Sequence, residues 1–182
     1  MNKIQGSFKL NGDSVTLQEC DYLNIELVGK HAEQTNSSVL VSKQSLPIVL
    51  SCKWILSKSG YASTYDFDKL GLPHCRGGIK LHRLLKPAPI GYVVDHINHN
   101  RLDNRLENLR VCTPKENSYN TSKRNGKFKG VKKQSNGKWM AKAHKDGKKY
   151  ELKDIATEKE AAKLYDILAE ELFGEYAGKN FF

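Results

Sequence analysis

Two tight-turn signals near the C-terminal end constrain the fold of this chain more strongly than any other feature. Asn136-Gly137 and Asp146-Gly147 separate three strand-like stretches, FKGVKKQ, KWMAKAH and KKYELKDI. Asn-Gly and Asp-Gly pairs readily adopt the left-handed backbone that two-residue hairpin loops require. We therefore predict a three-stranded antiparallel sheet in this part of the chain.

An amphipathic helix is expected directly after this sheet. Thr157 and Glu160 form a capping-box pattern, and Gly174 marks the helix end. Between them, apolar residues recur at helical spacing: Ala161, Leu164, Tyr165, Leu168, Ala169, Leu172 and Phe173. Residues 128–182 thus predict one sheet packed on one helix.

Alternation along the middle strand predicts which face meets the helix. Lys138, Met140 and Lys142 share one face, and Trp139, Ala141 and Ala143 share the other. The lysine face is then free for a partner. Trp139 either packs against the helix or contacts a groove of the partner, and alternation favours packing.

The net charge of +10 is concentrated in one stretch of this 182-residue chain. From Lys123 to Lys153 there are twelve Lys and Arg, against only Asp146 and Glu151, and the rest of the chain is balanced. A dense cationic field predicts a polyanionic partner, most commonly double-stranded DNA. A solubilising surface is the alternative.

Several classes of protein are disfavoured. The four cysteines form no C-x-x-C pair, which argues against a zinc knuckle and a secreted disulfide framework. No apolar run reaches signal-peptide length or the roughly 18 residues of a membrane span. We expect no membrane partner and a cytoplasmic protein, in a phage-infected or bacterial cell.

The rest of the chain predicts an α+β protein. Residues 1–50 read as a β-rich segment with strands SFKL, SVTLQ, YLNIELV and SVLVS, and CKWILSKSGYAST reads as a hairpin around Ser59-Gly60. After GIKLHRLL and a Pro-rich loop come strand YVVDHI, a polar loop, strand LRVCT and a helix capped by Thr113 and Glu116. We expect a core over residues 51–122, a linker over 123–127, and a separate C-terminal module over 128–182.

Asp95 and His96 are the first candidates for chemistry. At a strand end, adjacent side chains point in different directions, so the carboxylate can hold a hard cation while the imidazole faces a water molecule. An unperturbed imidazole, with a pKa of about 6.5, can act as a base near neutral pH. An amide carbonyl can fix its second nitrogen, although most of the nearby amides are expected in turns and caps: Asn98, Asn100, Asn104, Asn108, Asn117 and Asn120.

The sequence VVDHINHNRLDNRLENLRVCTPKEN resembles the HNH motif of the ββα-metal endonucleases, particularly the branch in phage intron-encoded homing enzymes. The resemblance implies that Asp95 is the first metal ligand, His96 the general base, Asn108 the residue that orients it, and Asn117 the second ligand. The alternative for Asp95 and His96 is a capped turn with a surface histidine. For Asn108 it is a loop amide that bonds the backbone, and for Asn117 a solvated helix residue.

Many members of that family have histidine at the position of Asn117. An oxygen-only ligand set favours one Mg²⁺ or Mn²⁺ per active site over zinc. The resemblance further implies a 3′ hydroxyl and a 5′ phosphate as products, by nicking or double-strand cutting. We expect a monomer or homodimer without a small-molecule cofactor.

Other positions can contact phosphate. His82 resembles a recurrent family position and, with Arg83, can meet the scissile phosphate, whereas the alternative is a strand histidine at the edge of the core. Arg101, Arg105 and Arg110 are candidate phosphate clamps, and an ordinary solvated role is equally open.

The stretch from Gly130 to the C-terminal end resembles an AP2/ERF-type DNA-binding domain, most specifically in TEKEAAKLYDILAEELFGEYAGKNF. The resemblance implies that the sheet enters the major groove. The expected contacts are Lys129, Lys132, Lys133, Lys138, Lys142, Lys148 and Lys149. Lysine reads guanine less selectively than arginine, so affinity without tight base specificity is expected.

Together these features predict a metal-dependent DNA endonuclease with a DNA-binding module. The first alternative is a noncatalytic DNA-binding regulator that retains an HNH scaffold. The second is an RNA-binding or ribosome-associated basic protein, which explains the charge but not the motif.

Overall fold

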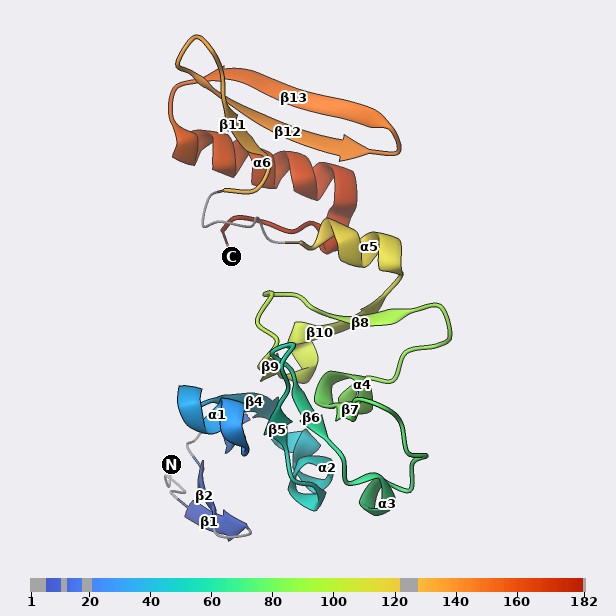
Figure 1. The fold of residues 1–182 in the computed structure, drawn as a ribbon. Coiled ribbons are helices and arrows are strands. Elements are labelled where there is room, and N and C mark those ends of the chain that lie inside the picture. The colour runs from blue at the N-terminus through green and yellow to red at the C-terminus, as the bar shows by residue number, and fades with distance from the viewer. Residues whose placement is uncertain (1–5, 11–12, 18–20, 122–127, 182) are drawn as a thin grey trace. The chain divides into compact units, whose positions relative to one another are not determined.

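The computed structural model describes residues 6–10, 13–17, 21–121 and 128–181. The chain forms two compact units, whose elements are labelled in Figure 1. The first unit comprises Met1–His96 and Asn100–Val111, and the second comprises Ile97–His99 and Cys112–Phe182. Small sheets and short helices alternate in both, which confirms the expected α+β class. The expected linker over 123–127 lies outside the described residues, and the other expected segment boundaries stay predictions.

The first unit begins with the predicted strands. β1 (Gly6–Leu10) pairs antiparallel with β2 (Asp13–Leu17), and β3 (Tyr22–Glu26) pairs antiparallel with β4 (Ser38–Ser42). Helix α1 (Lys30–Thr35), which the sequence pattern did not predict, connects β3 to β4. It ends at Asn36, in the left-handed conformation that asparagine tolerates.

Short elements follow β4. The predicted hairpin forms around Gly60, with β5 (Ile55–Leu56) antiparallel to β6 (Ala62–Thr64). β7 (Ile79–Lys80) adds to β6 as a third strand. The helical elements of this part are the 3-10 helix η1 (Lys43–Ser45), α2 (Leu46–Ser51), α3 (Phe67–Leu70) and α4 (Leu81–Leu85).

One core joins β3 and β4 to the hairpin and α4. Its fully buried side chains include Leu23 of β3, Val41 of β4, Ala62 of the hairpin, and Leu81 of α4. The Trp54 indole, also buried there, donates a hydrogen bond of 2.8 Å to the carbonyl of Val49. Removing β3 and β4 would therefore expose the apolar side of the elements that follow.

The predicted strand, polar loop and strand complete the first unit. β8 (Val93–His96) and β10 (Leu109–Cys112) form a two-stranded sheet. The loop between them contains two elements that were not predicted, the short strand β9 (Asp103–Asn104) and the 3-10 helix η2 (Leu106–Asn108).

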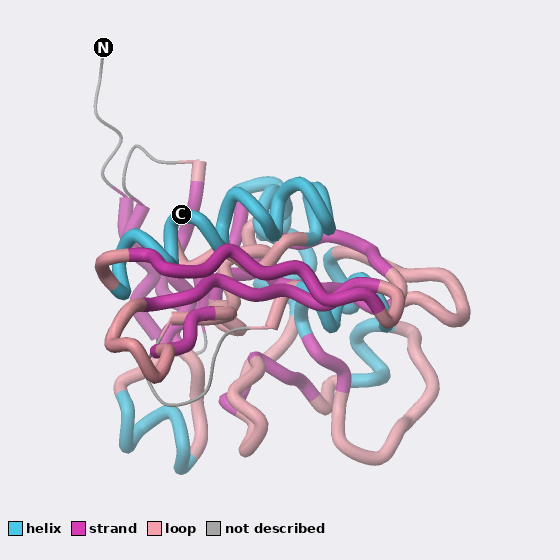
Figure 2. The backbone as a smooth tube through the Cα atoms, turned by 90° about the horizontal axis from the view of Figure 1, so that it is seen from above, coloured by secondary structure: helices cyan, strands magenta, loops and turns pink. Residues whose placement is uncertain are grey.

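The second unit contains α5 (Pro114–Tyr119) and the predicted sheet and helix. Figure 2 shows the antiparallel sheet, in the order β11 (Val131–Lys133), β12 (Trp139–Lys145) and β13 (Lys148–Ile155). Helix α6 (Glu158–Phe173) packs on one face and continues into the 3-10 helix η3 (Gly174–Tyr176). Both turn glycines have positive φ angles, which confirms the turn prediction. In the described ranges, no helix is long and apolar enough to cross a membrane.

The core of the sheet-and-helix part follows the predicted alternation. Ala141 and Ala143 of β12 are buried against Tyr165 and Ala169 of α6. Trp139 packs beside a second small cluster of Val131, Ala161 and Ala162, so it contributes to packing as alternation favours. The opposite face of β12 is turned away from α6.

Candidate functional site

The polar loop after β8 is anchored to the N-terminal sheet. β9 pairs in parallel with β4, and the amide of Leu40 donates to the carbonyl of Leu102 at 2.8 Å. The Ser42 hydroxyl accepts a hydrogen bond of 2.9 Å from the amide of Leu106. Residues before position 50 thus fix the loop that carries most of the candidate amides.

Asp95 lies in a buried ion pair with Arg110 across the β8–β10 sheet. The guanidinium donates from Nε at 3.0 Å and from Nη2 at 2.8 Å, both to Asp95 Oδ2. Both residues are 8% exposed. Arg110, predicted as a phosphate clamp, therefore holds the orientation of the predicted metal ligand. Breaking such a buried pair is strongly destabilising, because it leaves an uncompensated charge.

His96 belongs to a cluster of three rings. Its imidazole lies edge-on to that of His82, with 5.0 Å between centroids, and the Tyr61 ring lies 4.9 Å from His82 and 6.0 Å from His96. His82 is buried on helix α4, so the strand position weighed from the sequence was wrong. Leu81 and Leu84 pack into the core at helical spacing, which places His82 beside the site.

Burial keeps both imidazoles neutral. Desolvation, together with the nearby His96, Lys80 and Arg83, lowers the pKa of His82 to about 3. Desolvation also lowers the pKa of His96, against opposing effects of hydrogen bonding with Asn104 and of the carboxylates of Asp95 and Asp103. Arg101 adds to the lowering. A neutral His96 can accept a proton from water.

Two buried amides lie in the anchored loop. Asn104 donates from Nδ2 to the carbonyl of Arg101 at 3.1 Å, and its side chain partly offsets the lowering of the His96 pKa by burial. Asn108 donates from Nδ2 to the carbonyl of Asp103 at 2.7 Å. The structure thus brings Asn104 to act on His96, and the orienting role of Asn108 stays a prediction.

Asn117 lies on α5, in the second unit, whereas Asp95 and His96 lie in the first. The predicted capping box is present: the Thr113 hydroxyl accepts from the amide of Glu116 at 3.2 Å, and Glu116 Oε2 accepts from the amide of Thr113 at 2.7 Å. This cap determines where α5 begins. The role of Asn117 as a metal ligand stays a prediction.

The predicted arginines fall into two groups. Arg83 and Arg101 are exposed, and Arg101 donates to the carbonyl of Ser59 at 2.7 Å. Arg105, like Arg110, is bound to a carboxylate: its Nε and Nη2 each donate to Asp103 at 2.7 Å. Arg83 and Arg101 are thus the better placed of the four to meet a phosphate, and all four phosphate contacts stay predictions.

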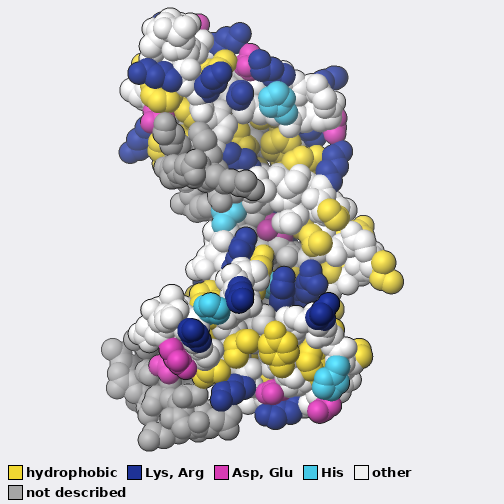
Figure 3. All heavy atoms as spheres, in the orientation of Figure 1, with side chains coloured by type: hydrophobic (Ala, Val, Ile, Leu, Met, Phe, Trp, Pro, Cys, Tyr) yellow, Lys and Arg dark blue, Asp and Glu magenta, His cyan; other side chains and the backbone are white. Residues whose placement is uncertain are grey.

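Most of the predicted lysines lie on exposed parts of the C-terminal sheet (Figure 3). Strand register places Lys132 opposite Met140, Lys142 opposite Glu151, and Lys149 opposite His144. These three lysines share the face turned away from α6, and we call them the lysine face. Lys133, Lys138 and Lys148 are exposed near the strand ends.

Lys129 differs from the other predicted DNA contacts. It is half-buried, and its ammonium donates to the carbonyl of Tyr119 at 2.5 Å. Burial lowers its pKa to about 8, while Asp166 acts in the opposite direction. This lysine is therefore held by contacts within the second unit.

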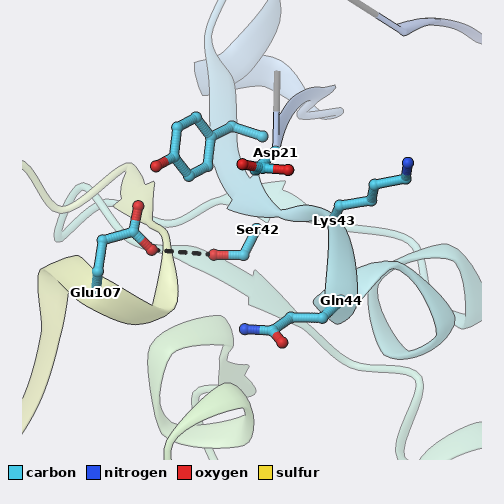
Figure 4. Close-up of a pocket in the computed structure, with 6 residues that line it drawn as sticks. Asp21, Ser42, Lys43, Gln44 and Glu107 are labelled. Atoms are coloured by element: carbon cyan, nitrogen blue, oxygen red, sulfur yellow. Dashed lines mark hydrogen bonds between the residues drawn. The ribbon is translucent and has the colours of Figure 1, made fainter. Parts of the chain in front are cut away.

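A polar pocket lies where β3, β4 and η2 meet. Figure 4 shows its lining, in which Ser42 donates to Glu107 at 3.4 Å. The Tyr22 ring, which also lines the pocket, lies 4.7 Å below the Arg105 guanidinium. None of the predicted catalytic residues lines this pocket. The pocket lies beside the ion pair of Arg105 with Glu107, which helps to hold the loop.

Sequence reasoning missed three residues of the site. Tyr61 and Lys80 lie beside the imidazoles, and Asn104 was expected in a turn. An aromatic residue directly after the Ser59-Gly60 turn was the available signal for Tyr61. Nothing in the sequence distinguishes Asn104 from its neighbours, because its place depends on the pairing of β9 with β4.

The comparisons now define the class of protein. A family profile described as HNH endonuclease matches residues 87–119, which include β8, the anchored loop, β10 and α5. An uncharacterized HNH endonuclease of Acanthamoeba polyphaga mimivirus is 42% identical over 146 residues, covering 77% of this chain and 73% of that protein. The chain therefore belongs to the HNH endonucleases, and it is a nuclease that hydrolyses DNA.

Two further relatives are viral or prophage-derived. Protein 3.8 of Escherichia phage T7 is 34% identical over 95 residues, covering 50% of this chain and 78% of that protein. A protein of Bacillus subtilis (strain 168), named as an SPbeta prophage-derived HNH homing endonuclease, is 29% identical over 84 residues, or 42% of this chain and 49% of that protein. No solved structure matches the chain.

The buried His82 predicts a specific dependence of stability on pH. Because its folded-state pKa of about 3 lies below the unfolded value, the unfolded chain binds more protons between about pH 6.5 and pH 3. Stability should therefore fall as pH decreases through this window, by up to about 1.4 kcal/mol per unit. In His82→Gln, denaturant unfolding at pH 7 and pH 5 should show a smaller loss.

The control is His31→Gln, on the exposed surface of α1, which should retain the wild-type difference between the two pH values. An equal loss of stability in wild type and His82→Gln would show that His82 is not held neutral in the folded protein.

Proposed function

We propose that this endonuclease hydrolyses a DNA phosphodiester with His96 as general base and one divalent metal. The observation that supports the base is the buried, neutral imidazole adjoining Asp95 in the segment that matches the family. Proton transfer from an attacking water requires an unprotonated nitrogen at neutral pH. His96 meets this requirement because burial lowers its pKa.

Asp95 and Asn117 are the proposed metal ligands, on the basis of their positions in the motif. Nucleases of this family generally use a divalent metal. A carboxylate and an amide are hard oxygen donors, which suit Mg²⁺ or Mn²⁺ when phosphate and water complete the shell. No group of three His, Cys, Asp or Glu suited to holding a metal occurs in the described part of the chain. The ligand set therefore fits a cation that is shared with the substrate.

When bound, such a cation stabilises charge on the transition state and on the departing oxygen. The chain's own residues supply the rest. Arg110 holds the Asp95 carboxylate in place, Asn104 acts on the His96 imidazole, and Asn108 is proposed to help orient it. His82 is proposed to pack against His96 and face the phosphate. The expected products are a 3′ hydroxyl and a 5′ phosphate.

We further propose that the C-terminal sheet is an AP2/ERF-like DNA anchor. The lysine face supports this proposal, because Lys132, Lys142 and Lys149 project from one side of a sheet whose other side packs on α6. Lys133, Lys138 and Lys148 extend the positive surface at the strand ends. One motif per chain cuts one strand per binding event, so a monomer would nick and a homodimer would cut both strands. We propose the cytoplasm of the host cell as its place of action.

The alternative left open by the sequence is a noncatalytic regulator, which would bind DNA through the lysine face and leave it intact. Membership of the HNH endonucleases argues against it. One observation in its direction is the ion pair in which Asp95 Oδ2 accepts two hydrogen bonds from Arg110, because this pair competes with a cation for the same carboxylate.

Catalysis is tested with supercoiled plasmids that carry DNA selected for binding to the protein. With Mg²⁺ or Mn²⁺, wild type should nick this DNA, and His96→Ala should be slower by about 100-fold or more. DNA ligase should reseal the nick, since the products carry a 3′ hydroxyl and a 5′ phosphate. EDTA is the control for metal dependence. Bound DNA that stays intact would favour the regulator.

The anchor is tested by the salt dependence of binding. Replacing Lys132, Lys142 and Lys149 by alanine should reduce the slope of log affinity against log salt by about 3, since each lost phosphate contact removes about 0.9. Lys159→Ala and Lys163→Ala, exposed on α6, form the control. An unchanged slope in the triple variant would place the DNA elsewhere.

A further inference from the structure

Three cationic side chains of the first unit surround the ring cluster at His96. They are Lys80 at the end of β7, Arg83 on α4, and Arg101 in the loop after β8. Arg83 and Lys80 lie near enough to His82 to lower its pKa, and Arg101 does the same to His96. In the described ranges, no carboxylate forms an ion pair with any of the three.

Tyr61 links two of these cations to the imidazoles. The Lys80 ammonium lies 4.5 Å from the centre of its ring, and the Arg101 guanidinium lies 4.9 Å from it. The same ring lies 4.9 Å from His82 and 6.0 Å from His96. A single aromatic side chain therefore holds an ammonium and a guanidinium close to the proposed general base.

The hairpin turn keeps Tyr61 and Arg101 in place. The amide of Ser57 donates to the carbonyl of Tyr61 at 2.9 Å, and the Ser57 hydroxyl accepts from the amide of Tyr61 at 3.1 Å. Arg101 bonds the carbonyl of Ser59 within the same turn, at 2.7 Å. The group is thus preorganised before any ligand binds.

Like charges gathered without a carboxylate are unfavourable unless an anion joins them. Burial, together with repulsion from Arg83 and Arg101, lowers the pKa of Lys80. By contrast, Arg105 and Arg110 in the same unit each have a carboxylate partner. Arginines that have a carboxylate partner stabilise the fold, whereas the cations without one are available to bind an anion.

We propose that Tyr61, Lys80 and Arg101 form a phosphate subsite that binds the DNA backbone next to the phosphate being cut. This inference rests on the proposed function, because His96 defines where the cut occurs. Its ligand is a phosphodiester of the same strand. Its role is to position that strand, so it acts on binding more than on the chemical step.

The test uses Lys80→Met and Tyr61→Leu in a His96→Ala background, without metal, so that cleavage plays no part. Lys80→Met should weaken DNA binding by about tenfold at 0.1 M salt and reduce the salt slope by about 1. Tyr61→Leu should weaken binding, and Tyr61→Phe should not, because the ring and not the hydroxyl holds the cations. Lys69→Met is the control, since that ammonium pairs with Asp66 at 3.4 Å.

In the catalytically intact protein, Lys80→Met should raise KM with little change in kcat. An unchanged salt slope, or a loss no larger than that of Lys69→Met, overturns the subsite. If the slope falls but wild type never cuts, the subsite stands and the proposed catalysis fails. Thermal melting of each variant confirms folding, and Lys80→Gln replaces Lys80→Met if the latter is unfolded.

A separate observation concerns α5 in the second unit. The carbonyl of Tyr119, in its last turn, accepts from the Lys129 ammonium at 2.5 Å and from the amide of Gly178 at 3.1 Å. The Tyr119 ring stacks on Phe173 of α6, with centroids 4.4 Å apart. Carbonyls at a helix end have no partner within the helix, so these donors fix where α5 ends.

The C-terminal segment around Gly178 is itself tied to α6. Asp166 accepts from the amide of Asn180 at 2.7 Å and from the amide of Phe181 at 3.0 Å. A Cβ atom at Gly178 would lie 2.8 Å from the Tyr119 carbonyl oxygen and 2.7 Å from the Lys129 ammonium. Only glycine allows this approach of the two backbones.

We infer that this contact, which we call the α5 seat, holds the helix that carries Asn117 and so affects how well Asn117 can serve as a metal ligand. Gly178, Lys129 and Phe173 are then positioning residues. This inference also rests on the proposed function, through the role of Asn117.

The test is Gly178→Ala, with Lys163→Ala, exposed on α6, as control. Calorimetric titration of Mn²⁺ into the complex with uncleavable DNA should show affinity reduced by about tenfold in Gly178→Ala, as for residues that orient ligands. Lys163→Ala should bind Mn²⁺ as wild type does. Amide hydrogen exchange should also be faster in α5 of Gly178→Ala.

The outcomes separate the two hypotheses. If wild type binds no Mn²⁺, the proposed metal site fails. If wild type binds Mn²⁺ and Gly178→Ala binds it equally while α5 exchanges faster, the α5 seat is structural only. Lys129→Met, which removes one donor without adding a clash, repeats the test if Gly178→Ala does not fold.

Discussion

The parallel pairing of β9 with β4 is the interaction on which the candidate site depends. A loop rich in asparagine and arginine, with little apolar surface, has no cohesion of its own. Pairing through Leu40 and Val41 gives the loop backbone partners inside a buried sheet. The amide of Asn104 and the ion pair of Arg105 with Asp103 then acquire fixed places beside the imidazoles and the sheet edge. The N-terminal segment thereby shapes chemistry that lies some 60 residues further along the chain.

Charge is distributed in this protein according to whether a carboxylate is near. Arg105 and Arg110 are neutralised by Asp103 and Asp95, and both hold parts of the scaffold. On the C-terminal sheet, Glu151 pairs with Lys149 at 2.6 Å and with Lys153 at 3.5 Å, and ion pairs near the surface contribute little. Lys132 and Lys142 on this sheet, and the cations around Tyr61, have no such partner among the ion pairs of the described residues. The basic residues of this chain thus serve in two ways: some form internal ion pairs, and others form a surface suited to a polyanion.

Local signals predicted the C-terminal sheet and helix well. Asn136-Gly137, Asp146-Gly147 and the two capping boxes act over a few residues, so their effect can be read from the sequence. Helix α4 was missed because LHRLL is too short for its period to be distinguished from a strand pattern. β9, Tyr61 and Asn104 were missed because their positions depend on contacts between distant segments. The motif predicted which residue types matter, but not which amide acts on His96.

The shared core has a consequence for anyone who wishes to move this nuclease into another protein. Leu23 and Val41 are packed with Ala62 and Leu81, so β3 and β4 share one continuous core with the hairpin and α4. A portable catalytic fragment cut at residue 51 would leave Trp54 without its backbone partner at Val49 and the polar loop without β4. A transplanted nuclease would therefore need the early strands β3 and β4 as well as the motif that the family profile matches.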